Sequence, residues 1–324
     1  MSTMNTTAAP TPLLQSRFAS FLVEKPYVGF DIAPIIEIDG ISGDYPKDIR
    51  AVFSTDKTDS AYDALTPQPL MSEGRPVGDA IGSGSVSLDY FSEFTDIPRV
   101  SNLGALGIDG EGRALRLLSK RALRRHVASL GSALGTQGNY AYTVDGPDIT
   151  TATNLIMGVI LTAMQAVLDW GDGAIDATDL DITTNPAVAR SLRANNDLRQ
   201  SLPAGSQDQR INAATLRQAF ADETDGGNLI VLPQRVQTGG TEGYAMGNHI
   251  AITVRGGAES LSFLNTFTDM NNSGETADGS MPSLAWVEMY KPEGLDGMRA
   301  KSHEYHKIQV EHAGAGALVF DVLS

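Results

Sequence analysis

The feature that most constrains this chain is the stretch 30–98, where strand-like segments alternate with polar, turn-rich spacers. An apolar run at 32–38 leads into glycine, aspartate and proline, and extended segments resume at "IRAVFST" and "GSGSVSLDYFSEFTDIP". Strands so poor in apolar residues cannot fill a hydrophobic core of their own. We therefore predict a long β-hairpin or projecting loop, and loops of this length are usually functional.

The clearest predicted helix covers residues 111–134 and ends at Gly135. At 100° per residue, one side of this helix is apolar and carries Leu115, Leu118, Ala122, Leu123 and Leu130. The opposite side carries four cations, here called the basic stripe: Arg113, Arg116, Lys120 and Arg124. Length, amphipathicity and the glycine stop all favour a long helix with one buried face.

Further elements follow along the chain. Helices are predicted at 150–170 and at 211–222. Between them a further helix is predicted to begin at Pro186, with Asn185 as its N-cap. Strands are predicted at 228–233, 249–256, 283–290, 307–312 and 316–323. We expect a flexible surface loop at 237–247 and a hinge or bulge at "GSGS", 82–85. Helices in the middle and strands at both ends predict an α+β fold.

Charge and hydropathy exclude several classes of protein. The chain has 324 residues, 39 acidic against 24 basic side chains, and a net charge of −15. So acidic a surface repels a polyanion, which argues against broad nucleic-acid binding. Cysteine is absent, which excludes disulfides and thiolate metal sites. The most apolar helix is interrupted by Thr162 and Gln165 and is too short to span a bilayer, so we expect a soluble protein without a membrane partner.

The sequence lacks the usual catalytic motifs, including the nucleophile elbow, the P-loop and the dinucleotide fingerprint. "HEYH" at 303–306 does not have the spacing that places two imidazoles on one helical face, and in a strand they point to opposite faces. We interpret it as exposed polar residues before a strand. The acidic stretch 169–181 lacks the calcium-loop pattern and reads as a helix end with an acidic loop. We expect no catalytic residue, metal or cofactor.

The basic stripe is the one electrostatic anomaly, because six of the 24 basic residues fall between Arg113 and Arg125. Three interpretations stay open: contact with nucleic acid, ion pairs with acidic surfaces of neighbouring subunits, or a solvated helix face. Single exposed ion pairs contribute only about 0–1 kcal/mol, but repeated pairs could set the register of an assembly. Trp170 and Trp286 are interpreted as core anchors.

The order of these segments resembles that of the tailed-bacteriophage major capsid proteins, which have the Hong Kong 97-type capsid fold. The resemblance rests on "IAPIIEIDGISGDYPK", "GRPVGDA", "FSEFTDIPR", "DLDITTNPAVARSLRANNDLRQSL" and "HKIQVEHAGAGALVFDVL". It covers nearly the whole chain after about residue 20, and the order of the motifs carries more weight than any one of them.

The resemblance implies named parts for this chain. Residues 1–30 would be an N-terminal arm and 31–98 an extended β loop. Residues 99–174 would form a peripheral domain with a spine helix at about 110–135 and a second helix. Residues 175–283 would form an axial domain, and 284–324 would return as strands to the peripheral domain.

The resemblance also implies a function. Such a chain is a shell protein that assembles into hexamers and pentamers of an icosahedral head, is built in the host cytoplasm and becomes part of the virion capsid. The head encloses double-stranded DNA, which the shell protein meets only through non-specific proximity. Its partners are other copies of itself and portal, scaffold and decoration proteins. Assembly contacts are expected at six charged residues: Glu73, Arg75, Arg113, Arg116, Lys120 and Arg124.

Three alternatives stay open. A bacterial nanocompartment shell has the same fold and encloses an enzyme, not a genome. Another phage structural component, such as a tail or decoration protein, would also have no catalytic site. An enzyme with a site assembled from scattered residues belongs to a different class, and a small discrete oligomer would favour it.

Overall fold

The computed structural model of the chain describes residues 27–48, 81–98, 109–151, 153–201, 211–238, 241–255, 261–269 and 285–323. Within these residues the strands form two five-stranded sheets and two two-stranded hairpins. The mixture of helices and strands confirms the predicted α+β class.

One sheet, here called the long sheet, is built on a single long strand, β13 (Gly297–Val310). Two strands follow one another along one edge of β13, both antiparallel to it: β11 (Leu264–Asp269) and β12 (Ala285–Tyr290). The other edge of β13 pairs with β4 (Asp89–Pro98) over ten residues. Beyond β11, β1 (Ile35–Ile38) pairs in parallel. β13 therefore holds the long sheet together.

The second sheet, here called the core sheet, lies in the largest hydrophobic cluster. Its strand order is β5 (Tyr142–Asp145), β14 (Gly316–Phe320), β10 (Ile250–Val254), β6 (Leu180–Thr184) and β7 (Asn228–Val231). Every residue of β6 and β10 is buried, as expected for strands with a neighbour on each side and a covered face. The predicted apolar final strand, β14, is likewise internal to its sheet.

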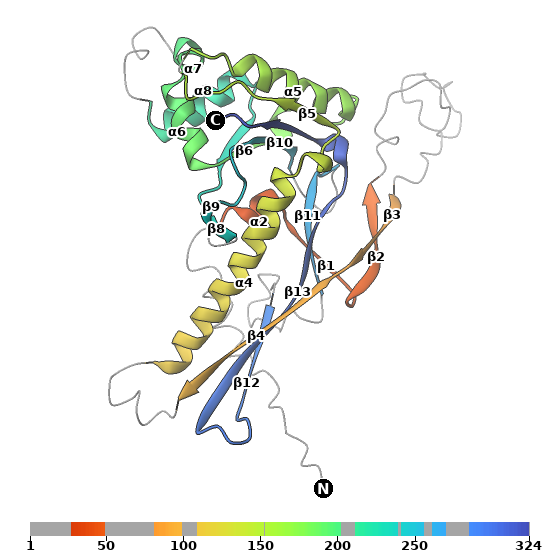
Figure 1. Ribbon diagram of the computed structural model, residues 1–324. Helices are drawn as coiled ribbons and strands as arrows, with labels where there is room; N and C mark the ends of the chain where they lie inside the picture. Colours follow the sequence, from red (N-terminus) through yellow and green to blue (C-terminus); the bar gives the residue numbers. More distant parts are fainter. Residues whose placement is uncertain are drawn as a thin grey trace, which may run out of the picture.

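The helices connect and cover these sheets (Figure 1). α4 (Gly110–Gly135) begins against the long sheet, where Leu115 and Ala122 pack, and ends in the core cluster with Leu134. Four helices lie over the core sheet: α5 (Met157–Gly171), α6 (Pro186–Ala194), α7 (Asn196–Ser201) and α8 (Ala213–Glu223). Short helical turns lie at α2 (Gly29–Ile32), η2 (Gln137–Asn139), η3 (Ala177–Asp179) and η5 (Ala313–Ala315).

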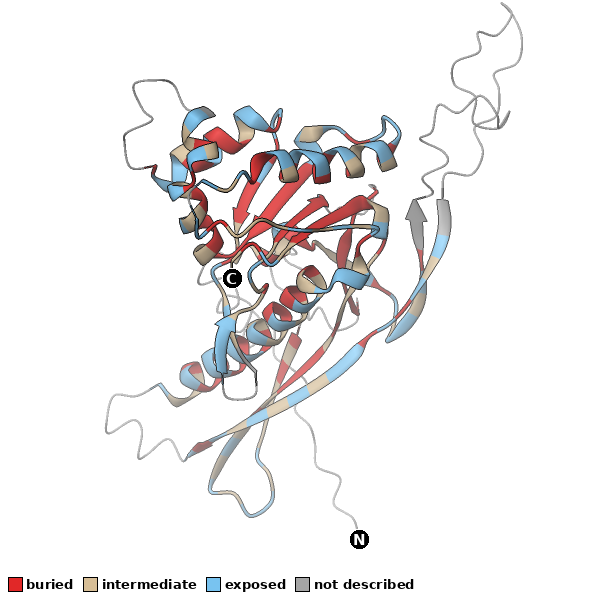
Figure 2. Cartoon of the chain, turned by 45° about the horizontal axis from the view of Figure 1, so that its top comes forward, coloured by how far each residue is buried: buried red, intermediate tan, exposed pale blue. Residues whose placement is uncertain are grey.

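Two hairpins extend from this body. The larger pairs β2 (Ser42–Asp48) with β3 (Ile81–Ser87) and projects away from both sheets (Figure 2). Only Leu88 separates β3 from β4, so the projecting hairpin and the long sheet share one nearly continuous strand. The smaller hairpin joins β8 (Arg235–Thr238) and β9 (Thr241–Tyr244).

The long amphipathic helix is confirmed, with boundaries one residue from those predicted at each end. Asp109 caps it by accepting a hydrogen bond from the backbone N–H of Gly112 at 2.9 Å. The predicted cap at Asn185 is also confirmed, because its side-chain oxygen accepts from the backbone N–H groups of Ala187 and Val188. The helix that follows is interrupted at the buried Asn195, which divides it into α6 and α7.

The second helix begins later than predicted, at Met157 rather than at about residue 150. Its cap comes from a distant part of the chain. Asp197 accepts hydrogen bonds from the backbone N–H groups of Ile156 and Met157, at 3.0 and 2.8 Å. Because the capping carboxylate lies forty residues further on, no local pattern could locate this helix start.

Three interpretations of local sequence were wrong. "HEYH" lies inside β13, not before a strand, and His303, Glu304 and His306 are buried. "GSGS" is part of β3, not a hinge between strands. The predicted loop 237–247 contains strand β9 and the buried Met246. In the first two cases pairing with a strand far along the chain overrides the local polarity, while β9 pairs with the nearby β8.

Both tryptophans are only half-buried. Trp170 packs against the core cluster as predicted, whereas Trp286 lies outside the hydrophobic clusters. Trp286 stacks on His303 with 4.1 Å between ring centroids, and Trp170 lies against His312. The predicted strand "IRAVFST" lies outside the described residues.

The sheets do not divide the chain where the predicted ranges do. β1 and β4, both from 31–98, belong to the long sheet, and the described residues of this range that project are those of the hairpin β2–β3. β11, from 175–283, also joins the long sheet, and β14, from 284–324, joins the core sheet. The domain boundaries themselves stay a prediction.

Candidate assembly surfaces

The projecting hairpin is held at its root by a small hydrophobic cluster. The cluster consists of Ile38, Tyr45, Val86, Leu88 and Phe267. Outside it, most of the described hairpin side chains are exposed, Ser42, Asp44 and Ser83 among them. Two strands with so little apolar contact are marginal on their own in water. The hairpin therefore has a paired backbone, and its described side chains contribute very little core.

The long sheet has two different faces. α4 covers one face through a cluster that includes Leu115, Leu118, Ala285 and Val287. The other face, here called the aromatic face, carries Tyr90, Phe94, Trp286, Tyr290, His303 and Tyr305. Strand alternation and register place these side chains on the same side. Phe94 is 56% exposed and Tyr90 48% exposed.

The side chains of the aromatic face hold one another in place. The imidazole of His303 lies within hydrogen-bonding distance of the Tyr90 hydroxyl, at 2.8 Å. Arg299 lies over the Phe94 ring at 3.9 Å and donates to Asp96. Burial lowers the pKa of His303, although its contact with Glu288 opposes this. Exposed aromatic residues that are already ordered lose little conformational entropy on docking, which suits a protein interface.

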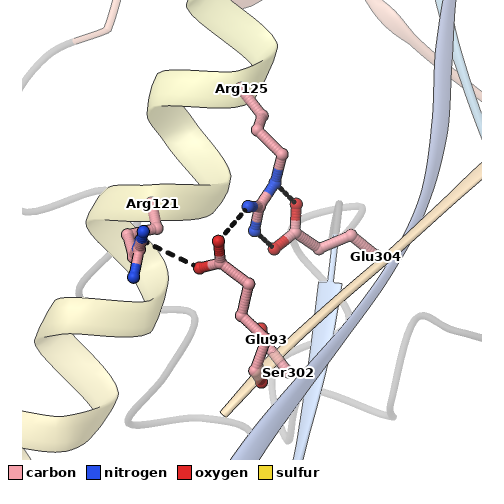
Figure 3. A network of polar contacts seen from close by, with 5 residues as sticks. All are labelled: Glu93, Arg121, Arg125, Ser302 and Glu304. Atoms are coloured by element: carbon pink, nitrogen blue, oxygen red, sulfur yellow. Dashed lines mark hydrogen bonds and ion pairs between the residues drawn. The ribbon is translucent and has the colours of Figure 1, made fainter. Parts of the chain in front are cut away.

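An ion-pair network fixes α4 to the long sheet (Figure 3). The guanidinium of Arg125 donates to both carboxylate oxygens of Glu304 on β13, through Nε at 2.8 Å and through Nη2. Its Nη1 lies 2.7 Å from Glu93 of β4, and Glu93 also pairs with Arg121 at 3.0 Å. One arginine thereby connects a helix to two strands.

Burial and the ion pairs have opposite effects on the pKa values of Glu304 and Arg125. Burial raises the pKa of Glu304, whose side chain is fully buried, and the bidentate contact with Arg125 opposes that rise. Burial also disfavours the charged form of Arg125, but its bonds to Glu304 and Glu93 outweigh this and raise its pKa. The bidentate contact between Arg125 and Glu304 holds α4 in one position on the sheet.

The basic stripe lies on the exposed side of α4. Arg113, Arg116, Lys120 and Arg124 are all exposed, as the helical period predicts. Spacings of three and four residues set them along about 16 Å of the helix. Leu117, on the same exposed side, is 47% exposed. The stripe is therefore a surface feature, while the neighbouring Arg121 and Arg125 point toward the sheet and its acids.

Of the six predicted contact residues, Glu73 and Arg75 lie outside the described residues. The other four form the stripe. Sequence reasoning missed the aromatic face, the Arg125 network and the hairpin root. The aromatic face had a signal in β4, where exposed residues alternate with half-buried ones. The exposed residues are Tyr90, Ser92, Phe94 and Asp96.

Two buried imidazoles lie where α4 crosses the long sheet. His126 is fully buried, with Nδ1 2.7 Å from the Tyr27 hydroxyl and Nε2 3.0 Å from the hydroxyl of Thr266. Thr266 donates to the carbonyl of Ala33, so its oxygen must accept from His126 Nε2–H. Nδ1 therefore accepts from Tyr27, and neutral His126 is fully hydrogen-bonded. Across from it, both ring nitrogens of the buried His306 have no hydrogen-bond partner among the described residues.

No group of three or more potential metal ligands lies together in the described part of the chain. A hollow of about 440 Å³ lies between the end of α4 and β9, but glycine, serine, threonine and alanine form most of its lining. His249 is its single titratable histidine, and burial lowers the pKa of that residue. None of the helices described is both long and apolar enough to cross a membrane.

No family model matches the sequence, and no curated protein matches it. Solved structures do. A phage-related protein from Bordetella bronchiseptica RB50 superposes with a TM-score of 0.69 at 14% identity, covering 97% of both chains.

Two further structures are similar over most of their length. A virus-like particle from Pyrococcus furiosus matches with a TM-score of 0.50 at 12% identity, over 95% of this chain and 97% of the other. The encapsulin of the holo-SrpI complex from Synechococcus elongatus PCC 7942 also reaches 0.50, at 11% identity, over 98% and 91%.

The chain has the capsid fold. The fold predicted from the order of sequence segments is thus confirmed, at identities too low for sequence comparison alone. Phe94 and Tyr90 of the aromatic face are among the large apolar side chains that the described residues leave exposed.

Proposed function

We propose that this protein is the major capsid protein of a tailed bacteriophage. It assembles into hexamers and pentamers of an icosahedral head that encloses double-stranded DNA. The observation that carries the proposal is the pairing of a capsid fold with a projecting hairpin that has almost no core of its own. A hairpin that cannot bury itself is stabilised when a neighbouring copy covers it.

The aromatic face is the complementary surface for such a contact. It offers Phe94 and Tyr90, which are 56% and 48% exposed, on a sheet held rigid by β13. Obligate interfaces of assemblies typically bury about 2,000–5,000 Å². At about 25 cal/mol per Å² of apolar surface, burial on this scale outweighs the repulsion between subunits of net charge −15.

The basic stripe gives this contact a charged component. Outside residues 113–125 the chain has 18 basic and 39 acidic side chains, since six of its 24 cations and none of its acids lie in that segment. Each copy therefore offers a strongly acidic surface to the stripe of another copy. Interactions of this kind contribute more to orientation and specificity than to affinity.

The genome-enclosing role is favoured by the overall charge. An acidic inner wall repels DNA and lets it pack and leave without being bound. We propose a location in the virion capsid after assembly in the host cytoplasm, with portal, scaffold and decoration proteins as partners and no catalytic activity. The second candidate is a nanocompartment shell, favoured by the similarity to the encapsulin structure.

The assembly test replaces residues 47–82 by Asn-Gly. Pro46 and Ser83 are directly opposite one another in the hairpin, so a two-residue turn can join them. The variant should keep the folded body and lose closed particles in electron micrographs. Normal particles from this variant would contradict the proposed role of the hairpin.

The two candidates are separated by the contents of the particles. Particles purified from an infected or induced host are treated with nuclease and then opened. Protected double-stranded DNA of uniform length supports the phage head. A single enriched protein cargo without DNA supports the nanocompartment.

A further inference from the structure

One tyrosine connects the projecting hairpin to the body of the protein. Tyr45 lies in β2 and is only 6% exposed, although Ser42 and Asp44 of the same strand are exposed. Its hydroxyl donates to the carboxylate of Glu311, with distances of 2.7 and 2.8 Å to the two oxygens. Gln309 Nε2 donates to the same hydroxyl at 3.2 Å. These partners lie at and just beyond the end of β13, so the contact joins segments far apart in the sequence.

The Tyr45 ring occupies space that a glycine leaves open. Gly84 is directly opposite Tyr45 in the hairpin register. A Cβ on Gly84 would lie 2.4 Å from the Tyr45 ring, closer than real atoms approach. On its other side the ring contacts Phe267 of β11, with centroids 4.4 Å apart. The ring is thus held between a strand of the hairpin and a strand of the long sheet.

We propose that Tyr45, with Gly84 and Glu311, forms a latch that sets the direction in which the hairpin leaves the body. Tyr45 is the fourth residue of β2, and the three residues beyond it extend the strand by about 10 Å. A rotation of about 10° at the latch therefore moves the end of β2 by about 2 Å. The inference rests on the proposed shell function: the hairpin of one copy meets another copy, so the latch sets the angle between neighbouring subunits and the curvature of the shell.

The position of the latch supports a positioning role over a merely stabilising one. The hydroxyl is the only polar atom of Tyr45's side chain, and it bonds to a carboxylate on the body, not to the hairpin. A side chain that only strengthened the hairpin would bond within it. Hydrogen bonds to charged groups are also short and directional, so this one constrains an angle as well as a distance.

The test uses Tyr45→Phe, which keeps the ring and removes the hydroxyl, and Tyr142→Phe as a matched control on the half-buried strand β5. Hydrogen exchange is measured in the described hairpin segments, with all proteins in the same assembly state. We expect exchange in Ser42–Asp48 and Ile81–Ser87 to become about tenfold faster in Tyr45→Phe alone. Unchanged exchange would overturn the latch.

Particle diameter distinguishes the two roles of Tyr45, because a residue that only stabilised the hairpin would not change it. We expect Tyr45→Phe to produce a mixture of particle diameters where the wild type and Tyr142→Phe produce one. Gly84→Ala should do the same, because the added methyl displaces the ring, and should add no further effect in a Tyr45→Ala background. A single wild-type diameter in both Tyr45→Phe and Gly84→Ala would refute the proposal. If the wild type forms no particles, the shell function fails, and hydrogen exchange still tests the latch.

Discussion

The rings of His126 and His306 face each other across the junction of α4 and the long sheet, with centroids 5.9 Å apart. Burial lowers the pKa of His126 to about 3, and the proximity of His306 adds to this. Burial lowers the pKa of His306 to about 4; the cation of Arg125 adds to this and the carboxylate of Asp89 opposes it. Tyr27, on the other side of His126, is neutral throughout this pH range because burial raises its pKa.

These shifts predict loss of stability in acid. Below pH 6.5 the unfolded chain takes up a proton on each histidine, while the folded chain stays neutral down to about pH 4. Each histidine therefore lowers the free energy of unfolding by about 1.4 kcal/mol per pH unit over this window. His306→Phe should reduce the fall in stability between pH 6.5 and 4, measured by chemical denaturation at several pH values. His312→Gln serves as the control, and equal pH dependence in wild type and His306→Phe would contradict the assignment.

The Arg125 network predicts a large loss of stability when the guanidinium is replaced by an uncharged side chain of similar length. Arg125→Met leaves the carboxylate of Glu304 buried without its partner, which should lower the free energy of unfolding by about 3–5 kcal/mol. Arg121→Gln removes an exposed partner of Glu93 and should cost less than about 1 kcal/mol. Denaturant titration of both variants checks the ranking. Equal losses would mean that the bidentate pair does not hold α4 to the sheet.

The distant helix cap predicts a change at the start of α5. Asp197→Ala leaves two backbone N–H groups at the start of α5 without their acceptor and should cost about 0.5–2 kcal/mol. Asp169→Ala, on the exposed surface of the same helix, is the control. Hydrogen exchange should accelerate at the first turn of α5 in the first variant only. Exchange that is unchanged at Met157–Ile160 would show that Asp197 is not the cap.

Charge reversal of the basic stripe predicts a defect in assembly without a defect in folding. The triple variant Arg116→Glu, Lys120→Glu and Arg124→Glu changes only exposed side chains, so its thermal midpoint should stay close to that of the wild type. Its assembly yield by sedimentation should fall because acidic neighbours now repel the helix.

A control with the same change in net charge reverses Arg190, Arg217 and Lys291, which are exposed elsewhere. If both triple variants assemble as the wild type does, the stripe is a solvated helix face. An equal defect in both would assign the effect to net charge alone.

The sequence predicts the parts of the fold whose signals are local. The apolar side of α4, the cap at Asn185 and the apolar strand β10 all follow from side chains close together in the chain. The projecting hairpin was also predictable, because its residues are too polar for a core. The sequence did not predict that other strands of residues 31–98 leave the hairpin. β1 and β4 join the long sheet because they pair with β11 and β13, about two hundred residues away or more.

The candidate surfaces were less predictable, for the same reason. Asp181 makes the buried strand β6 look polar in the sequence. Its carboxylate is accommodated by Arg255, just beyond β10, at 3.1 Å and by Asn228 of β7 at 3.0 Å. The sequence "HEYH" indicates a polar surface, but in the structure β4 pairs with this segment and α4 covers one face of it. Likewise the buried position of Tyr45 depends on Gly84 and Glu311 together, and neither residue alone indicates a contact.

The most direct test of the account is the mass and symmetry of the purified full-length chain, by mass photometry and cryo-electron microscopy over a range of concentrations. We predict closed megadalton particles, or five- and six-fold rings, that form above a threshold concentration. A compact monomer or small oligomer at every concentration, with scaffold protein present as well as absent, would contradict the proposed shell.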